Sequence, residues 1–348
     1  MRVVIGHPSA SFVFVATNSP DTRILLVGAF DEALHAHAGL RRRALERLGC
    51  RVTTLNLIGT GGWLSRLRRV GLHDRLARAI ASTAPVLVLV LEGSQVDAEM
   101  VAALRHAGGH GGGPAWVNWF CDARRSPEDI LPFAAAYDAV FVADSATVEA
   151  LDVPGNPPVH YLPAACDPSI HRPMRARDRF RANVVFAGTA TAHRERQLAE
   201  LVEFGVAVWG PGWRRTKLRD YCRGELLPHE DYIRAYAGAS VAINVGCTDG
   251  TEGPPDPGAS RRLFELAAIG VPQVVEEHPD IHWHFREGSE ILVARTARDL
   301  RTLTAEALHD RAWAEQVAAG ARQRALAEHT YMHRLSALLQ AMVAATVA

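Results

Sequence analysis

Residues 183–201 read NVVFAGTATAHRERQLAEL, in which an apolar run is followed by a turn and then by a helical pattern. The apolar run Asn183–Ala187 predicts a buried strand, because it is short, rich in valine and bounded by a turn. Gly188 and Thr189 supply that turn, and a helical pattern begins near Ala192. A buried strand followed by a helix is the repeating unit of a parallel sheet that is covered on both faces. The sequence therefore predicts an α/β protein.

The same alternation of apolar runs and helical patterns fills most of the 348 residues. In the first half the predicted strands are Arg23–Val27, Arg51–Leu57, Val86–Leu91, Ala115–Phe120, Ala139–Ala143 and Val159–Leu162. In the second half they are Asn183–Ala187, Val206–Trp209, Val241–Val245, Pro272–Glu276 and Ile291–Ala294. Residues 1–20 suggest two further short strands, and residues 59–74 and 105–114 are expected to be loops or short helices.

The series breaks at Asp167–Arg181 (DPSIHRPMRARDRFR), where prolines and arginines replace the apolar periodicity. A chain of this length is expected to form about two domains, each with its own core. We therefore expect an N-terminal Rossmann-like domain over residues 1–172 and a C-terminal one over 173–325. Residues 326–348 are helical by composition and are expected to return across the domain junction.

Composition limits the classes of partner. The 38 basic residues balance the 38 acidic residues, so no overall positive field draws nucleic acid or an acidic membrane to the protein. The five cysteines are scattered without a C-x-x-C pair, which favours reduced thiols over a zinc site. No apolar run approaches the roughly 20 residues of a transmembrane helix, and no signal peptide is evident. We expect a cytoplasmic protein.

The stretch Gly258–Pro272 (GASRRLFELAAIGVP) predicts a helix whose start suits a phosphate group. Ser260 is a favourable N-cap residue, and Gly270 ends the helical pattern. The free N–H groups and the positive end of such a helix attract a diphosphate. Arg262 and Glu265 can face the same side, where they would meet phosphate and a ribose diol respectively. Spacing alone favours an ordinary exposed ion pair instead.

The turn at Gly188 is a second candidate for ligand binding. It follows a predicted strand, and parallel sheets bind ligands outside the carboxyl ends of their strands. Gly188 permits close approach of a ligand to the backbone, and Arg194 or Arg196 can reach a phosphate. The G-x-G-x-x-G pattern of NAD-binding domains is missing here. A plain turn before a solvated basic helix explains the same residues at least as well.

Several strings occur in a fixed order over roughly residues 115–340. In the second half they are FAGT…HRERQLAEL (Phe186–Leu201), VWGPGW (Val208–Trp213), DYIRAYAGASVAINV (Asp231–Val245), SRRLFELAAIGVP (Ser260–Pro272) and FREGSEILV (Phe285–Val293). Flanking strings are WFCD (Trp119–Asp122), HYLPAACDPSIHRP (His160–Pro173) and HTYMHRL (His329–Leu335). Together they resemble the CgeB-like (spore protein type) glycosyltransferases of the GT-B superfamily. The resemblance implies a GT-B fold, with two Rossmann-like domains facing across a central cleft.

The resemblance also implies that a nucleoside diphosphate sugar is the donor, with no metal and no other cofactor. The resemblance places Gly188, Thr189 and Arg194 at the donor diphosphate, and Gly210, within Trp209–Trp213, near the nucleobase. It places Asn244 in the cleft and Ser260 and Arg262 beside the phosphates. It assigns Glu265 to the ribose. The base, the sugar and the acceptor are not identified by these residues.

Asp122 is the preferred catalytic candidate, because it follows a predicted strand at the carboxyl edge of the N-terminal sheet. A carboxylate there can take a proton from an acceptor hydroxyl, although a helix-capping aspartate is an equal alternative. His37 is a second candidate, although an exposed histidine on a helix is the stronger interpretation. Many retaining relatives carry a glutamate at the position of Pro257, so the stereochemical outcome is open. Glu252 is a possible substitute for that glutamate, although a solvated turn is the stronger interpretation.

Two other classes of function fit the same pattern. A sugar-nucleotide epimerase or hydrolase uses the same two-domain fold, and a non-catalytic nucleotide-sugar-binding protein needs only the donor pocket. The histidines of the segment His278–His284 are not assigned to a metal, because metal sites need three or four convergent ligands.

Overall fold

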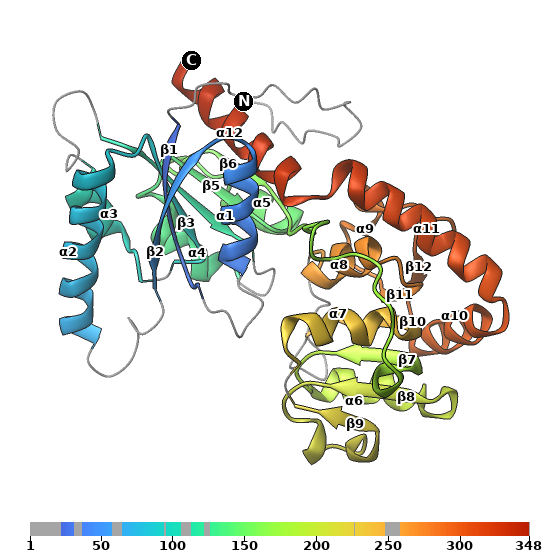
Figure 1. The fold of residues 1–348 in the computed structure, drawn as a ribbon. Helices are drawn as coiled ribbons and strands as arrows, with labels where there is room; N and C mark the ends of the chain where they lie inside the picture. Colours follow the sequence, from blue (N-terminus) through green and yellow to red (C-terminus); the bar gives the residue numbers. More distant parts are fainter. Residues whose placement is uncertain are drawn as a thin grey trace. The chain divides into compact units, whose positions relative to one another are not determined.

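The computed structural model describes residues 22–30, 37–57, 65–93, 95–105, 113–121, 126–225, 227–247 and 258–347. The chain divides into two compact units, each shown in Figure 1 with its own sheet. The N-terminal unit comprises Met1–Pro163 together with Tyr331–Ala348, and the C-terminal unit is the continuous segment Ala164–Thr330. Among the helices of the described ranges, none is long and apolar enough to cross a membrane.

The N-terminal unit is built on a six-stranded parallel sheet of order β2-β1-β3-β4-β5-β6. Its strands are β1 Arg23–Gly28, β2 Arg51–Asn56, β3 Leu87–Leu91, β4 Ala115–Phe120, β5 Ala139–Val142 and β6 Val159–Tyr161. Its helices are α1 His37–Arg47, α2 Ser65–Thr83, α3 Ala98–Leu104, α4 Pro127–Ala134, α5 Ser145–Leu151 and α12 Tyr331–Val347. This strand order is one of the two common arrangements of doubly wound α/β domains.

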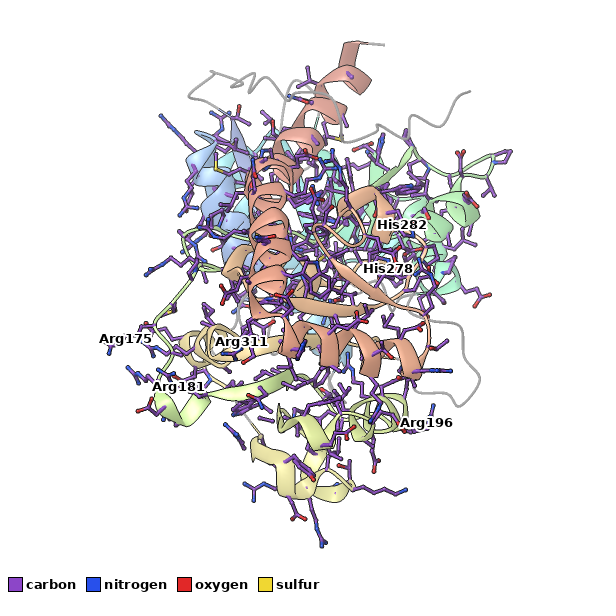
Figure 2. The ribbon with its side chains drawn as sticks, turned by 90° about the vertical axis from the view of Figure 1, so that its right-hand side faces the viewer. Arg175, Arg181, Arg196, His278, His282 and Arg311 are labelled. Atoms are coloured by element: carbon purple, nitrogen blue, oxygen red, sulfur yellow. The ribbon has the colours of Figure 1, made fainter. Side chains whose placement is uncertain are left out.

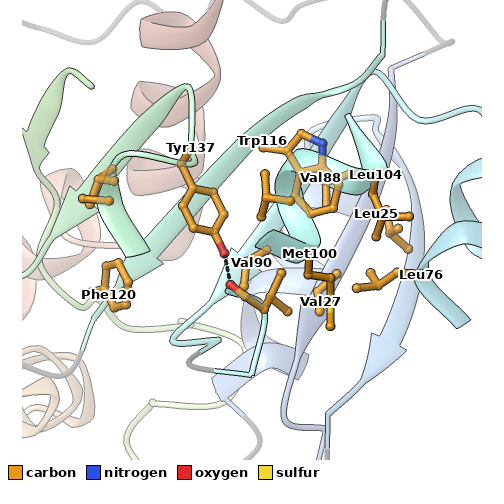
Figure 3. Close-up of a cluster of buried hydrophobic side chains, with 14 of the residues drawn as sticks. Leu25, Val27, Leu76, Val88, Val90, Met100, Leu104, Trp116, Phe120 and Tyr137 are labelled. Atoms are coloured by element: carbon orange, nitrogen blue, oxygen red, sulfur yellow. Dashed lines mark hydrogen bonds between the residues drawn. The ribbon is translucent and has the colours of Figure 1, made fainter. Parts of the chain in front are cut away.

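A single apolar core fills one face of this sheet (Figure 3). Alternate residues of β1, Leu25 and Val27, point into it, and helices α2 to α5 cover it. Trp116 of β4 is fully buried there. The hydroxyl of Tyr137 donates to the carbonyl oxygen of Val96 at 2.9 Å, so the polar end of this buried side chain has a partner. The helices are therefore held to the sheet mainly by apolar contact.

The opposite face of the N-terminal sheet contains a buried arginine. The guanidinium carbon of Arg41, from α1, lies 4.3 Å from the ring centre of Trp119 and 4.8 Å from that of Tyr331. Trp119 belongs to β4, and its indole N–H donates to the carbonyl oxygen of Leu162 at 2.7 Å. Tyr331 is the first residue of α12, which packs on α1. The end of the chain therefore completes the N-terminal unit.

The C-terminal unit contains a second six-stranded parallel sheet, of order β12-β11-β10-β7-β8-β9. The strands are β7 Ala182–Ala187, β8 Val206–Trp209, β9 Cys222–Gly224, β10 Ala239–Asn244, β11 Gln273–Glu276 and β12 Leu292–Ala294. The helices are α6 Ala192–Ala199, α7 His229–Ala237, α8 Arg261–Ile269, α9 Ile281–His284, α10 Ala297–His309 and α11 Arg311–Glu328. Helices α6 and α10 share a core with one face, and α7 and α8 share a core with the other.

The chain runs from β7 outward to β9 and then returns to the centre of the C-terminal sheet to form β10. This is the strand order of dinucleotide-binding Rossmann domains, and it creates a point at which the winding reverses, between β7 and β10. Helix α6, which follows β7, and helix α8, which follows β10, share cores with opposite faces of the sheet. Parallel sheets bind ligands at the carboxyl ends of the strands at such a point.

The prediction of an α/β fold with two Rossmann-like domains is confirmed. Two local expectations are wrong. Residues 65–74 belong to the long helix α2, in which Leu72 lies in the core together with Leu76 and Ile80 at helical spacing. Strand β9 was not expected from the sequence. It is only three residues long and contains no apolar run that would predict a strand.

The pair Val88 and Val86 tests the N-terminal core. Val88 is fully buried in β3, whereas Val86, two residues earlier, is 52% exposed. We expect Val88→Ala to lower the free energy of unfolding by about 2–3 kcal/mol, from lost burial and the cavity that remains. We expect Val86→Ala to change it by less than about 0.5 kcal/mol. Urea unfolding followed by tryptophan fluorescence measures both, and equal effects would contradict the described core.

Candidate functional site

The turn after β7 lies at the point where the winding of the C-terminal sheet reverses. Gly188 and Thr189 follow β7 directly, and Val245 and Gly246 follow β10, its neighbour in the sheet. Ligands of open parallel sheets bind in the crevice at this point. The strand order therefore places Gly188 and Thr189, two of the predicted donor-binding residues, at the position where a ligand is expected.

Arg194 joins the two sides of this position. Its side chain is buried, with 6% of the residue exposed. Nη1 donates to the carbonyl oxygen of Thr189 at 2.9 Å, and Nε donates to that of Gly246 at 2.9 Å. The α6 helix that carries Arg194 begins with Thr191, whose hydroxyl accepts from the Arg194 N–H. Arg194 thus fixes the turn after β7 to the end of β10, and its predicted contact with a diphosphate stays a prediction.

Two glycines allow the neighbouring turns to approach each other closely. Gly210 has φ +129°, and a Cβ there would lie 2.2 Å from the carbonyl oxygen of Gly188, so no other residue fits. The indole N–H of Trp213 donates to the same oxygen at 2.8 Å. A Cβ on Gly188 would lie 2.8 Å from Nη2 of Arg262. The absence of a side chain at Gly188 therefore lets this guanidinium reach the turn after β7.

Asn244, the last residue of β10, accepts hydrogen bonds from two of the other predicted residues. Ser260 precedes α8 as predicted, but its hydroxyl makes no capping bond with the helix and instead donates to Oδ1 of Asn244 at 3.0 Å. Nη1 of Arg262 donates to the same oxygen, also at 3.0 Å. The guanidinium of Arg262 lies over the ring of Phe186, 4.7 Å from its centre. Asn244, Ser260 and Arg262 thus form one hydrogen-bonded group at the start of α8.

Glu265 is buried one turn further along α8, with 2% of the residue exposed. Its Oε2 accepts from the hydroxyl of Tyr232 at 2.7 Å, and its Oε1 lies 2.9 Å from Nε of Arg261. Nδ1 of His171 accepts from a backbone N–H, so the Nε2 that faces Glu265 at 3.6 Å carries the ring proton. The exposed ion pair between Arg262 and Glu265 that the spacing favours therefore does not form. Glu265 is buried and pairs with Arg261 instead.

Burial and charge act together on Tyr232. Its side chain is buried, and this burial, followed by the negative charge of Glu265, raises the pKa of Tyr232 well above its ordinary value. Tyr232 therefore stays a hydrogen-bond donor to Glu265 at all physiological pH values. The contacts from Tyr232 and His171 could not be found from the sequence, because these residues lie 33 and 94 positions from Glu265.

A second carboxylate, Glu276 at the end of β11, was also not singled out in the sequence. Nε2 of His193 lies 2.6 Å from its Oε1, and the N–H of Gly246 donates to its Oε2 at 2.9 Å. Burial raises the pKa of Glu276, but the bonds from His193 and Gly246 and the charges of His193 and Arg194 outweigh burial and hold the pKa below its ordinary value of 4.5. The ends of β10 and β11 are thereby tied to the start of α6.

A small cavity of about 20 Å³ opens beside Asn244, which is room for roughly one water molecule. Its walls are Asn244, Gly246, Gly258, Ser260, Val275, Glu276, Glu277 and His278. His278 comes from the loop after β11, and Figure 2 shows it beside His282 of α9. In the part of the chain that the structure describes, no group of three or more metal-ligating side chains is close enough to hold a metal ion.

Several residues named from the sequence lie outside the described ranges. They are Asp122, Glu252, Pro257 and, as far as its side chain is concerned, His37, which begins α1. Their predicted roles stay predictions. All the predicted donor-binding residues belong to the C-terminal unit, where Gly188, Arg262, Asn244 and Ser260 meet, while Glu265 lies one turn beyond them.

Two units that each contain a six-stranded parallel sheet covered by helices define the class of fold, which is GT-B. Residues 193–340 match the family described as glycosyl transferase-like. No curated protein matches the chain. The family match covers less than half of the chain.

Solved structures with this fold align with nearly the whole chain. Sucrose-phosphate synthase from Thermosynechococcus elongatus has a TM-score of 0.68 at 14% identity, over 93% of this chain and 100% of that chain. HepE from Anabaena, solved with UDP and glucose, has a TM-score of 0.64 at 11% identity, with the same coverage of 93% and 100%. A putative UDP-N-acetylglucosamine 2-epimerase from Listeria monocytogenes has 0.59 at 12%, over 92% and 95%. At these identities the likeness establishes the fold alone.

The low pKa of Glu276 predicts a pH-dependent contribution to stability. A carboxyl whose pKa is lower in the folded than in the unfolded state stabilises the fold above about pH 4.5, and this contribution is lost as the pH falls through the folded-state pKa. We expect Glu276→Gln to destabilise the C-terminal unit by about 1–2 kcal/mol near pH 7.

The difference in unfolding free energy between wild type and Glu276→Gln is expected to shrink as the pH is lowered below 4.5. Urea unfolding at a series of pH values measures it. The matched control is Glu306→Gln, which changes an exposed carboxyl on α10. A difference that stays constant with pH would show that the charge of Glu276 does not stabilise the fold.

Proposed function

We propose that the protein transfers a sugar from a nucleoside diphosphate sugar to a hydroxyl or amine acceptor. The observation that carries this proposal is the group of Asn244, Ser260 and Arg262 at the start of α8, directly beside the Gly188 turn. A helix start, a guanidinium and a side-chain-free turn at the reversal point of a Rossmann sheet are the features that a diphosphate requires.

In this proposal Arg262 binds the diphosphate. Its Nη1 is held by Asn244 and its flat face lies on Phe186, so the orientation of the guanidinium is set before the donor arrives. A pre-oriented cation loses less conformational entropy on binding than a mobile one. The backbone of Gly188 and Thr189 lies against the same phosphates, and Ser260 lies beside them. Gly210 lies near the nucleobase, behind the Gly188 turn.

Glu265 accepts hydrogen bonds from the ribose diol. An ionised carboxylate has about four acceptor positions, so the hydrogen bond from Tyr232 and the ion pair with Arg261 leave acceptor capacity for a ligand. Those same partners prevent the carboxylate from rotating. Arg194 is a positioning residue in this account, because its donors hold the backbone of the two turns on which the donor rests.

Catalysis requires a base for the acceptor and a stabilised leaving group. Asp122, which follows β4 in the sequence of the N-terminal unit, is proposed as that base, with His37 as a second catalytic candidate. The departing diphosphate is stabilised by Arg262 and the start of α8, so the reaction needs no metal and no further cofactor. We expect turnover to be unaffected by chelators.

The finer assignments follow the same resemblance. We propose that the protein belongs to the CgeB-like branch of these enzymes and acts in the cytoplasm. Its partners are then a nucleotide-sugar donor and an acceptor that the donor site does not specify, and nucleic acid is not among them. The matched charges of the chain support that last point.

A sugar-nucleotide epimerase is the second candidate, and the similar fold of the Listeria protein favours it over other rivals. An epimerase or hydrolase consumes the donor without an acceptor. Incubation of a bound donor with and without candidate acceptors therefore separates the reactions. Acceptor-independent loss of donor at the full rate would favour the epimerase or hydrolase.

Donor binding is tested first with Arg262→Ala. Thermal-shift measurements with UDP, GDP, ADP and TDP and their glucose derivatives identify the donor, since binding to the folded state raises the melting temperature. We expect Arg262→Ala to weaken binding of that donor by about 10–100-fold, the value of a charged hydrogen bond. The matched control is Arg196→Ala, whose side chain is exposed on α6 (Figure 2). Equal loss in both variants, or no loss in either, would contradict the donor site.

Catalysis is tested with Asp122→Asn. We expect kcat to fall by about 10²–10⁴-fold, because the amide cannot take a proton, while the Kd for the donor stays within twofold of wild type. Steady-state kinetics and calorimetry measure the two constants separately. An unchanged kcat would show that Asp122 is not the catalytic base. The absence of any turnover with a donor that binds would favour a non-catalytic nucleotide-sugar-binding protein.

A further inference from the structure

A cavity of about 560 Å³ lies at the amino edge of the C-terminal sheet. It is lined by Ala182, the first residue of β7, and by Ala239 and Ser240, the first two residues of β10. Its other walls come from the ends of α7 and α8, from α10 and from the first turns of α11. Cavities of this size accommodate small ligands.

This cavity is separate from the candidate donor site. Ser240 and Asn244 are four residues apart on β10, which is about 13 Å along a strand. Asn244 lies at the carboxyl end of that strand, where the predicted donor-binding residues meet. None of those residues, all of them in the described ranges, lines the cavity. A ligand in this cavity would therefore occupy a site of its own.

Two arginines line the cavity. The guanidinium of Arg311, the first residue of α11, donates to the hydroxyl of Ser240, and this bond holds it at the start of β10. Within the described part of the chain, Arg311 forms no ion pair with a carboxylate. Arg181 pairs with Asp178 at 3.1 Å, but both side chains are largely exposed, so this pair is weak. Figure 2 shows Arg181 and Arg311, together with Arg175, on the same side of the C-terminal unit.

The charges of the walls favour an anion. Among the described residues that line the cavity, Glu315 is the only carboxylate, against two guanidinium groups. Close by but outside the walls, the positive charges of Arg175 and Arg177 balance the negative charges of Asp178 and Asp310. The walls therefore leave one positive charge in excess. A guanidinium offers a planar fork of donors, which matches the oxygens of a phosphate or a carboxylate.

The rest of the lining is mostly apolar and consists largely of small residues. Residues 173–174, 237–239 and 269–272 contribute proline, alanine, glycine, methionine, isoleucine and valine. An apolar group that lies against such walls gains free energy by leaving water, whereas an inorganic ion has no apolar surface to bury. Asn183 and Ser240 add an amide and a hydroxyl. The walls therefore match an anionic head group that is attached to an apolar body.

We propose that this cavity is a second binding site of the protein, for a small organic anion. Arg311 and Arg181 bind its phosphate or carboxylate group, and its apolar body lies on the small side chains behind them. The bond to Ser240 sets the orientation of the Arg311 guanidinium before the ligand arrives, which lowers the entropy that binding costs. The site does not depend on the proposed function, because none of its residues takes part in donor binding.

The test measures binding of phenyl phosphate and of benzoate to the full chain by calorimetry. Inorganic phosphate is the probe that lacks an apolar body, and the two organic probes separate a phosphate head group from a carboxylate. The variants are Arg311→Ala and Glu315→Gln, which remove opposite charges from one turn of α11. The matched control is Arg298→Ala, which removes an exposed arginine of α10 outside the cavity. Melting temperatures show that each variant folds.

We expect at least one organic probe to bind saturably, about tenfold or more tightly than inorganic phosphate, because its body is buried on the apolar walls. Arg311→Ala should weaken this binding about tenfold, since a charged contact is lost. Glu315→Gln should tighten it about twofold to threefold, since a repulsive charge is removed. Arg298→Ala should leave it within about twofold of wild type. This control changes the net charge as Arg311→Ala does, so it excludes a general effect of charge.

The absence of saturable binding of both organic probes up to about 10 mM would overturn the proposal. Equal affinities for the organic probes and inorganic phosphate would also overturn it, because the arginines alone would then account for binding. So would equal losses in Arg311→Ala and Arg298→Ala.

Arg262→Ala separates this cavity from the donor site. We expect this variant to bind the organic probe within about twofold of wild type, because Arg262 does not line the cavity. A loss of binding in Arg262→Ala that is as large as the loss in Arg311→Ala would place the probe at the donor site and overturn the proposal. Nucleotide binding is measured independently, so none of these outcomes decides the proposed function.

Discussion

The hydrogen bonds of Arg194 hold together the part of the structure on which the candidate site depends. Helices α6 and α8, which follow β7 and β10, lie on opposite faces of the sheet, so their own packing does not join the turn after β7 to the end of β10. One buried guanidinium donates to carbonyl oxygens on both sides. A buried cation is stable only when its donors are satisfied, so opening this position would expose or strand the charge. Gly188 and Asn244 keep their separation for this reason.

Features that depend on neighbouring residues were predictable from the sequence. Helix α8 begins at Arg261 and ends at Ile269, as its pattern predicts, because Gly270 takes the left-handed conformation that ends the helix. Strands β4 and β8 also have the predicted bounds, since each is an apolar run between turn residues. The position of Ser260 before α8 was correct as well, although the partner of its hydroxyl was not.

Features that depend on distant residues were not predictable. The hydroxyl of Ser260 bonds to Asn244, 16 positions away, because the buried amide oxygen needs donors more than the helix start does. The His193–Glu276 pair spans 83 positions and forms because the strand order brings the end of β11 within reach of the start of α6 at the carboxyl edge of the sheet. Strand order is a property of the whole sheet, and no local pattern encodes it. The same limit applies to the cavity at the amino edge of the sheet, whose walls come from residues spread over positions 173–315.

The placement of α12 has a consequence for how the protein is made. The C-terminal unit is one continuous segment, whereas the N-terminal unit needs Tyr331 and the residues after it. During synthesis the segment Ala164–Thr330 is therefore complete before the unit that precedes it in the sequence. Until Tyr331 is added to the chain, the guanidinium of Arg41 lacks one of the two aromatic rings that lie against it in the folded unit. The N-terminal unit is therefore completed only after Tyr331 and the residues that follow it have been synthesised. A ribosome that stops near residue 330 releases a chain with a complete C-terminal unit and an incomplete N-terminal unit.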